Sequence, residues 1–88
     1  SLLHIRVKRR AVRIKTNVKA YRAAAGLTQQ QLAEKVHVSA RTIISIEKEQ
    51  YSPSLMLAYR MARVFGVSVE ELCRLEENMR EEDAYETI

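Results

Sequence analysis

The chain has 88 residues, 47% of them hydrophobic and 30% charged, a balance that fits one small globular domain and excludes a disordered segment. Two glycines and one proline leave few positions for the tight turns that a many-stranded fold needs. The net charge is +4, the lone Cys73 cannot form an internal disulfide, and no apolar run approaches the ~18 residues of a membrane span.

The charges are separated along the chain. The first 22 residues hold eight lysines and arginines and no acid, whereas residues 76–88 hold six acids and a single base, Arg80. A basic end and an acidic tail are common in nucleic-acid-binding proteins, although two solvated charged ends would have the same composition.

Residues 1–15 alternate between apolar and basic side chains. Leu3, Ile5 and Val7 share one parity, and the alternation resumes at Val12 and Ile14. This period of two predicts a short extended basic segment, either two short strands or a disordered arm.

Residues 16–75 follow a helical period and predict five helices in a compact all-α bundle. Thr16 or Asn17 caps the first, and Gly26 ends it in the left-handed conformation. Thr28 and Ser68 open capping boxes for the second and fifth helices. Ser39 caps the third helix, which runs to about Lys48, and Gly66 ends the fourth, at 55–65. The residues expected to face inward are Val18, Tyr21, Ala25, Leu32, Ala33, Val36, Ile43, Ile46, Leu55, Ala58, Met61, Ala62, Phe65, Leu72 and Leu75.

The acidic residues 76–88 are expected to form a tail that is either a frayed helix or disordered.

The stretch from Leu27 to Glu47 meets the geometric needs of a helix-turn-helix. Ala33 is small enough to let the next helix approach, Val38 supplies an apolar residue in the turn, and Ile43 packs back on the preceding helix. The outer positions of the third helix are short, polar or cationic, as side chains that reach base edges must be: Ser39, Ala40, Arg41, Thr42 and Ser45.

Two outer residues of this helix have a specific predicted contact with DNA. Arg41 could bind guanine O6 and N7 with two hydrogen bonds, and otherwise it would bind phosphate or water. Ile44 also faces outward, where it either touches a thymine methyl group or is simply exposed.

The stretches 26–36 and 38–47, followed by 53–58 and 61–72, resemble the lambda-repressor-like (Xre/Cro type) helix-turn-helix family. The resemblance covers about residues 16–74. It implies a phosphate contact at Gln29, a backbone contact at Lys48, groove-facing positions at Ser39, Ala40, Arg41 and Ser45, and an ion pair between Arg22 and Glu47.

The sequence departs from the family pattern at two turns. His37 stands where the family usually has a glycine, and a positive φ there would cost about 1–2 kcal/mol. The usual glycine after the third helix is also replaced, within Glu47–Tyr51, and Glu49 would repel a nearby phosphate.

These observations predict a cytoplasmic transcriptional regulator of bacterial or archaeal type, a repressor, that binds double-stranded DNA as a homodimer. The alternative is an antitoxin or anti-repressor that keeps the fold and binds a protein through its acidic tail. No enzyme, metal site or cofactor is expected, because His4, His37 and Cys73 are isolated from one another in the sequence. Candidate dimer surfaces are the N-terminal segment, Met56 with Tyr59, and the fifth helix with Leu72, Leu75 and Met79.

Overall fold

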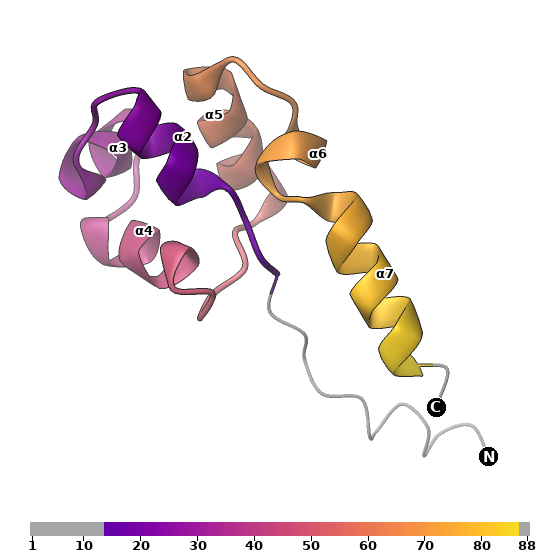
Figure 1. Ribbon diagram of the computed structural model, residues 1–88. Coiled ribbons are helices and arrows are strands. Elements are labelled where there is room, and N and C mark those ends of the chain that lie inside the picture. The colour runs from indigo at the N-terminus through magenta and orange to yellow at the C-terminus, as the bar shows by residue number, and fades with distance from the viewer. Residues whose placement is uncertain (1–13, 87–88) are drawn as a thin grey trace.

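The computed structural model describes residues 14–86, which contain six helices and no strand (Figure 1). Most of the expected extended segment, residues 1–13, lies outside the described residues, as do residues 87–88. The all-α prediction is confirmed, with one helix more than expected. In chain order the helices are α2 (Val18–Ala24), α3 (Gln29–Lys35), α4 (Ala40–Glu47), α5 (Leu55–Phe65), α6 (Val69–Leu72) and α7 (Leu75–Glu86).

The core lies between helices α2 to α6. Tyr21 of α2 stacks on Phe65 of α5 with ring centroids 5.7 Å apart, and α3 and α4 share the largest helix–helix contact. The backbone N–H of Asn17 donates to the carbonyl of Leu72 at 2.8 Å, which joins the start of α2 to the end of α6. The largest fully buried side chains are those of Val18, Leu32, Val36, Ile43, Ile46, Met61, Leu72 and Cys73.

Side-chain caps begin four of the helices. The hydroxyls of Thr28, Ser39, Ser54 and Ser68 each accept the backbone N–H three residues on, and Thr28 and Ser68 form the expected capping boxes. At the first helix the hydroxyl of Thr16 accepts the N–H of Val18 at 3.3 Å, so of the two expected residues it is Thr16 that bonds a free N–H of the first turn. Asn17 occupies the cap position without a side-chain capping bond, and its amide donates to the carbonyl of Glu71 at 3.0 Å.

A residue with positive φ follows each of the helices α2 to α6, and the first four of these residues share one hydrogen-bond pattern. Gly26 follows α2 and Gly66 follows α5, as expected, both with φ +72°. His37 follows α3 with φ +64°, and Glu49 follows α4 with φ +62°. In all four places the next residue donates its N–H to a carbonyl five residues back, which satisfies a carbonyl that the helix itself leaves free.

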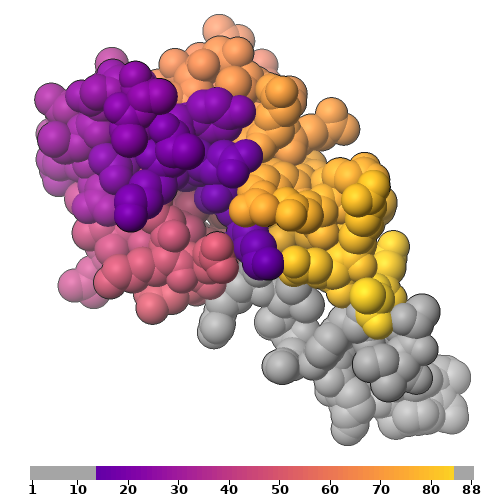
Figure 2. Space-filling model, viewed as in Figure 1, coloured from indigo at the N-terminus to yellow at the C-terminus, as the bar shows by residue number. Residues whose placement is uncertain are grey.

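The predicted fifth helix is divided in two. It ends after Leu72, Arg74 takes a φ of +49°, and a new helix begins at Leu75. That helix, α7, continues to Glu86, so most of the acidic tail is helical. It extends away from the other five helices, as Figures 1 and 2 show.

Three residues expected to face inward do not. Leu55, the first residue of α5, is 75% exposed. Leu57, two residues later, is buried in the core instead. Leu75 is 40% exposed, because the break at Arg74 makes it the first residue of a separate helix. Ala25 is also exposed, beyond the last residue of α2. None of the described helices is both long and apolar enough to cross a membrane.

Candidate nucleic-acid interface

The turn between α3 and α4 holds the two helices in one fixed arrangement. Ala33 is completely buried where the helices approach, and the N–H of Val38 donates to the carbonyl of Ala33 at 3.0 Å. Val38 packs against the core, so the turn is fixed from inside as well as by its backbone. His37 supplies the left-handed residue that this turn needs, although it lacks the freedom of glycine.

Helix α4 has two contrasting faces. Ile43 and Ile46 are fully buried, whereas Arg41 and Lys48, the residue after the helix, are exposed. The apolar side therefore fixes the helix in the body, and the opposite side presents cations outward.

A buried ion pair fixes the C-terminal end of α4. The carboxylate of Glu47 accepts Nε of Arg22 at 2.6 Å and Nη2 at 3.1 Å, and its side chain is only 4% exposed. The expected pair is thus present in two-pronged form, and its hydrogen bond raises the pKa of Arg22. Arg22 also donates to the carbonyl of Leu27 at 2.9 Å, so one guanidinium joins α2, α4 and the segment before α3.

Gln29 belongs to the same network, which sequence reasoning did not foresee. Its Nε2 donates to Glu47 at 3.0 Å, beside the bond from Arg22. An amide has two N–H donors, so this bond leaves one to reach another acceptor. Glu47, which Gln29 binds, is the residue before Lys48. Gln29 and Lys48, the two predicted phosphate-contacting residues, therefore both lie at the C-terminal end of α4.

The remaining predicted interface residues lie on or next to α4 but differ in exposure. Ser39 is exposed, and its hydroxyl is engaged with the N–H and hydroxyl of Thr42. Ala40 is partly buried against the core, so little of its surface is available to DNA. Thr42, Ile44 and Ser45 have intermediate exposure.

The candidate dimer residues also differ in exposure. Leu72 is completely buried in the core and offers no surface to a second copy. Leu75 and Met79 on α7 are 40% and 51% exposed, and Met56 and Tyr59 on α5 are 58% and 47% exposed. These two exposed pairs therefore remain as candidates, and most of the third candidate, the N-terminal segment, lies outside the described residues.

The metal-ligating and nucleophilic side chains within residues 14–86 were expected to be isolated from one another. Within residues 14–86 no three His, Cys, Asp or Glu side chains lie close enough together to hold a metal ion. Burial raises the pKa of the Cys73 thiol, which disfavours the reactive thiolate.

Asn78 is a structural residue that sequence reasoning missed. It is 5% exposed, and its amide bonds the backbone of Lys15 and the carbonyls of Cys73 and Arg74. Nothing in its acidic, mostly exposed surroundings in the sequence distinguishes it.

Comparison with known proteins adds to this geometry. The sequence model of the helix-turn-helix family matches residues 18–72, which span α2 to α6. An uncharacterized HTH-type transcriptional regulator from Methanocaldococcus jannaschii is 51% identical over 59 residues. These residues cover 67% of this chain and 89% of the relative. A second such regulator, from Bacillus subtilis, is 41% identical over 73% of this chain and 97% of its own length. The immunity repressor of Bacillus phage phi105 is 37% identical over 76% of this chain and 46% of its own.

Proposed function

The chain belongs to the helix-turn-helix family of lambda-repressor-like regulators, and from that premise we propose that it binds double-stranded DNA sequence-specifically and represses transcription. Helix α4 enters the major groove in this proposal, with the N-terminal part of the helix nearest the bases. The protein acts in the cytoplasm of a bacterial or archaeal cell, and it needs no cofactor. The relatives named as transcriptional regulators support a regulatory role, and the phage relative named as an immunity repressor favours repression.

The fixed, two-faced helix α4 is the observation that carries this proposal. Its inner residues Ile43 and Ile46 are fully buried, and Glu47 ties its last turn to α2 and α3. A helix held in this way can enter a groove without losing conformational freedom on binding, which lowers the cost of association.

The contacts divide into two kinds. Gln29 and Lys48 bind phosphates, and Lys48 contributes affinity that is independent of sequence and falls with salt. Arg41 reads guanine through O6 and N7, and Ile44 contacts a thymine methyl group. Ser39, Ala40, Thr42 and Ser45 lie close to the bases, although Ser39 keeps its bond to Thr42 in the free protein.

A homodimer completes the interface. One domain of this size makes few base contacts, and a two-fold dimer doubles them across half-sites about 34 Å apart. Within residues 14–86, the exposed pairs Leu75 with Met79, and Met56 with Tyr59, are the candidate surfaces for this contact, beside the N-terminal segment.

Selection of bound sequences from random duplex DNA tests the proposal. We expect enrichment of a palindrome whose half-site centres are about 10 base pairs apart. Recovery of sequences no different from the starting pool would refute sequence-specific binding.

A second candidate function is that of an antitoxin or anti-repressor. It is favoured by α7, an acidic helix that lies outside the matched residues 18–72 and extends from the body. Affinity capture with the full chain discriminates the two. Retention of one specific protein, with no retention of duplex DNA at low salt, would favour the second function.

A further inference from the structure

Two helices each carry a pair of exposed apolar side chains. Met56 and Tyr59 are three positions apart and share one side of α5, and Leu75 and Met79 are four positions apart and share one side of α7. All four side chains are large and at least 40% exposed. The other residues of 14–86 thus leave much of both pairs uncovered, and contact with a second molecule would remove this apolar surface from water.

Arginines without a carboxylate partner border the pair on α5. Arg60 follows Met56 by four residues and Arg63 follows Tyr59 by four, so all of these side chains lie on one side of the helix. Both arginines are exposed, and neither pairs with a carboxylate among residues 14–86. Arg63 instead lies over the ring of Tyr59, 5.9 Å from its centroid. We call these four residues the α5 face, which is apolar and positively charged.

Carboxylates border the pair on α7. The pair lies in an open groove of about 560 Å³ between α6 and α7. The groove is lined by Ser68, Glu70, Glu71, Leu75, Glu76 and Met79. Glu82 follows Met79 by one turn on the same side, and neither Glu70 nor Glu82 pairs with a cation among residues 14–86. We call Glu70, Leu75, Met79 and Glu82 the α7 face, which is apolar and negatively charged.

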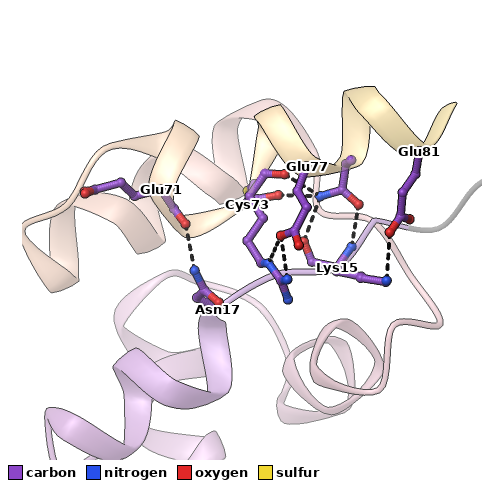
Figure 3. Close-up of polar contacts among 8 residues, drawn as sticks. Lys15, Asn17, Glu71, Cys73, Glu77 and Glu81 are labelled. Atoms are coloured by element: carbon purple, nitrogen blue, oxygen red, sulfur yellow. Dashed lines mark hydrogen bonds and ion pairs between the residues drawn. The ribbon is translucent and has the colours of Figure 1, made fainter. Parts of the chain in front are cut away.

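The described chain contacts a different side of α7. Asn78, at 5% exposure, accepts the backbone N–H of Lys15 at 2.9 Å. The carboxylate of Glu81 lies 2.8 Å from the Nζ of Lys15, as Figure 3 shows. These contacts hold the helix in place while Leu75 and Met79 stay exposed, so the α7 face is free for a contact with another molecule.

The charges determine which of these surfaces can meet. Two α7 faces in contact would bring the carboxylates of Glu70 and Glu82 from both copies together. Two α5 faces would bring Arg60 and Arg63 of both copies together in the same way. Like charges that meet across an interface oppose association, whereas opposite charges favour it. An α5 face against an α7 face combines opposite charges with apolar side chains on both partners.

We propose that the α5 face of one copy packs against the α7 face of a second copy, and that the same contact is repeated around a two-fold axis. This inference rests on the homodimer of the proposed function and names the surfaces that form it. Every copy carries both faces, so a two-fold axis produces the contact twice. Helix α7 begins after residues 18–72, which the family model matches, so the contact uses a part of the chain outside that model.

Charge reversal in the full chain tests this pairing. The first variant is Arg60→Glu with Arg63→Glu, and the second is Glu70→Arg with Glu82→Arg. None of the four residues has an ion pair within residues 14–86 that the substitution would break. Sedimentation equilibrium without DNA measures the dimer dissociation constant of each variant, of the native chain and of their mixtures.

The matched control is Lys19→Glu with Lys35→Glu. It changes the net charge by the same amount as the first variant, at two exposed residues on α2 and α3. Its dissociation constant should stay within about threefold of the native value, because only the general field of the protein changes. Thermal melts of every variant establish the folded fraction.

Each reversed variant alone should dimerise at least about tenfold more weakly than the native chain, because like charges then meet at both contacts. An equimolar mixture of the two should recover the native affinity. In that mixture the two reversed faces have opposite signs, and so do the two native faces.

Other outcomes would overturn the inference. If the second variant bound the native chain more tightly than the native chain binds itself, two α7 faces would be in contact. The same result for the first variant would indicate two α5 faces. A native chain that stays monomeric up to millimolar concentration, or an assembly larger than a dimer, would also overturn it. None of these measurements contains DNA, whereas a chain that dimerises as expected but selects no DNA sequence would refute the proposed function alone.

Disulfide cross-linking locates the contact independently. Tyr59→Cys and Met79→Cys each place a thiol near the middle of one face, and the native Cys73 is buried. After mild oxidation of an equimolar mixture, with an affinity tag on one variant, we expect the mixed dimer to predominate over either variant linked to itself. Predominant linkage of the Met79→Cys variant to itself would contradict the proposed pairing.

Discussion

The matched region, residues 18–72, and the helix α7 are held in place by different kinds of interaction. The first contains nearly all of the buried apolar side chains and one ion pair whose carboxylate is 4% exposed. The second buries one amide, that of Asn78, and among its described contacts the ion pairs Glu77 with Arg74 and Glu81 with Lys15 join it to the residues outside it. Pairs of this kind, with much of both side chains exposed, contribute little to stability, so Asn78 should contribute most among these contacts.

Because of this difference, we expect substitutions in the two regions to have different effects on stability. Loss of a partner inside the matched region leaves a buried charge and affects the whole fold. Loss of the Asn78 contacts should release α7 and the chain around Lys15 while α2 to α5 stay packed. The four predictions that follow, in order of decreasing size, test this separation.

Glu47→Ala should lower the free energy of unfolding by about 3 kcal/mol, because it leaves the guanidinium of Arg22 largely buried without its carboxylate. Thermal or urea denaturation followed by circular dichroism measures the change. Glu76→Ala is the matched control, since that carboxylate is 70% exposed in its pair with Arg80, and its effect should be much smaller. Equal losses for the two variants would contradict the distinction between buried and exposed pairs.

Arg41→Ala should leave stability unchanged and remove about 2 kcal/mol of discrimination at one base pair, because the side chain is exposed and reads DNA in the proposed function. Competition binding with the selected operator and its single-base variants measures this loss. Unchanged base preference would remove Arg41 from direct readout.

Asn78→Ala should cost about 1.5 kcal/mol, because the N–H of Lys15 loses its acceptor and the carbonyls of Lys15 and Cys73 lose the side-chain amide, whereas the carbonyl of Arg74 keeps the backbone N–H of residue 78. Hydrogen exchange locates the effect. Amides of α7 should exchange faster, while those of α3 and α4 keep their protection. A uniform increase over the whole chain would mean that α7 and the matched region unfold as one unit.

His37→Gly should stabilise the protein by about 1 kcal/mol, because φ is +64° at this position and glycine adopts that conformation without steric cost. Glu49→Gly, at φ +62°, is a parallel case inside the same region. Denaturation midpoints measure both. A loss of stability in both variants would show that the side chains make contacts that outweigh the backbone strain.

Local signals explain how much of the fold the sequence predicts. The caps at Thr28, Ser39 and Ser68, and the glycine stops at Gly26 and Gly66, depend on neighbouring residues and were all predicted correctly. The break at Arg74 was not predicted, because neither glycine nor proline marks it, although φ there is +49°. Leu55 was misplaced because helical periodicity does not fix which residue of the first turn enters the core.

The candidate site was only partly predictable, because several of its contacts join residues that are far apart in the sequence. The pair of Arg22 with Glu47 follows from the family resemblance, and the structure contains it. The bond from Gln29 to Glu47 and the contacts of Asn78 with Lys15 join residues that are 18 and 63 positions apart. No local pattern in the sequence reports contacts of this range, so only the folded chain reveals them.

The two-faced character of α4 has a consequence for how such proteins diversify. Ile43, Ile46 and Glu47 hold the fold together, while Arg41 and its outward neighbours are largely released from that task. Substitutions at the outer positions can therefore accumulate without unfolding the chain. One scaffold could in this way come to bind many different operators, and the same positions offer a place to redirect it by design.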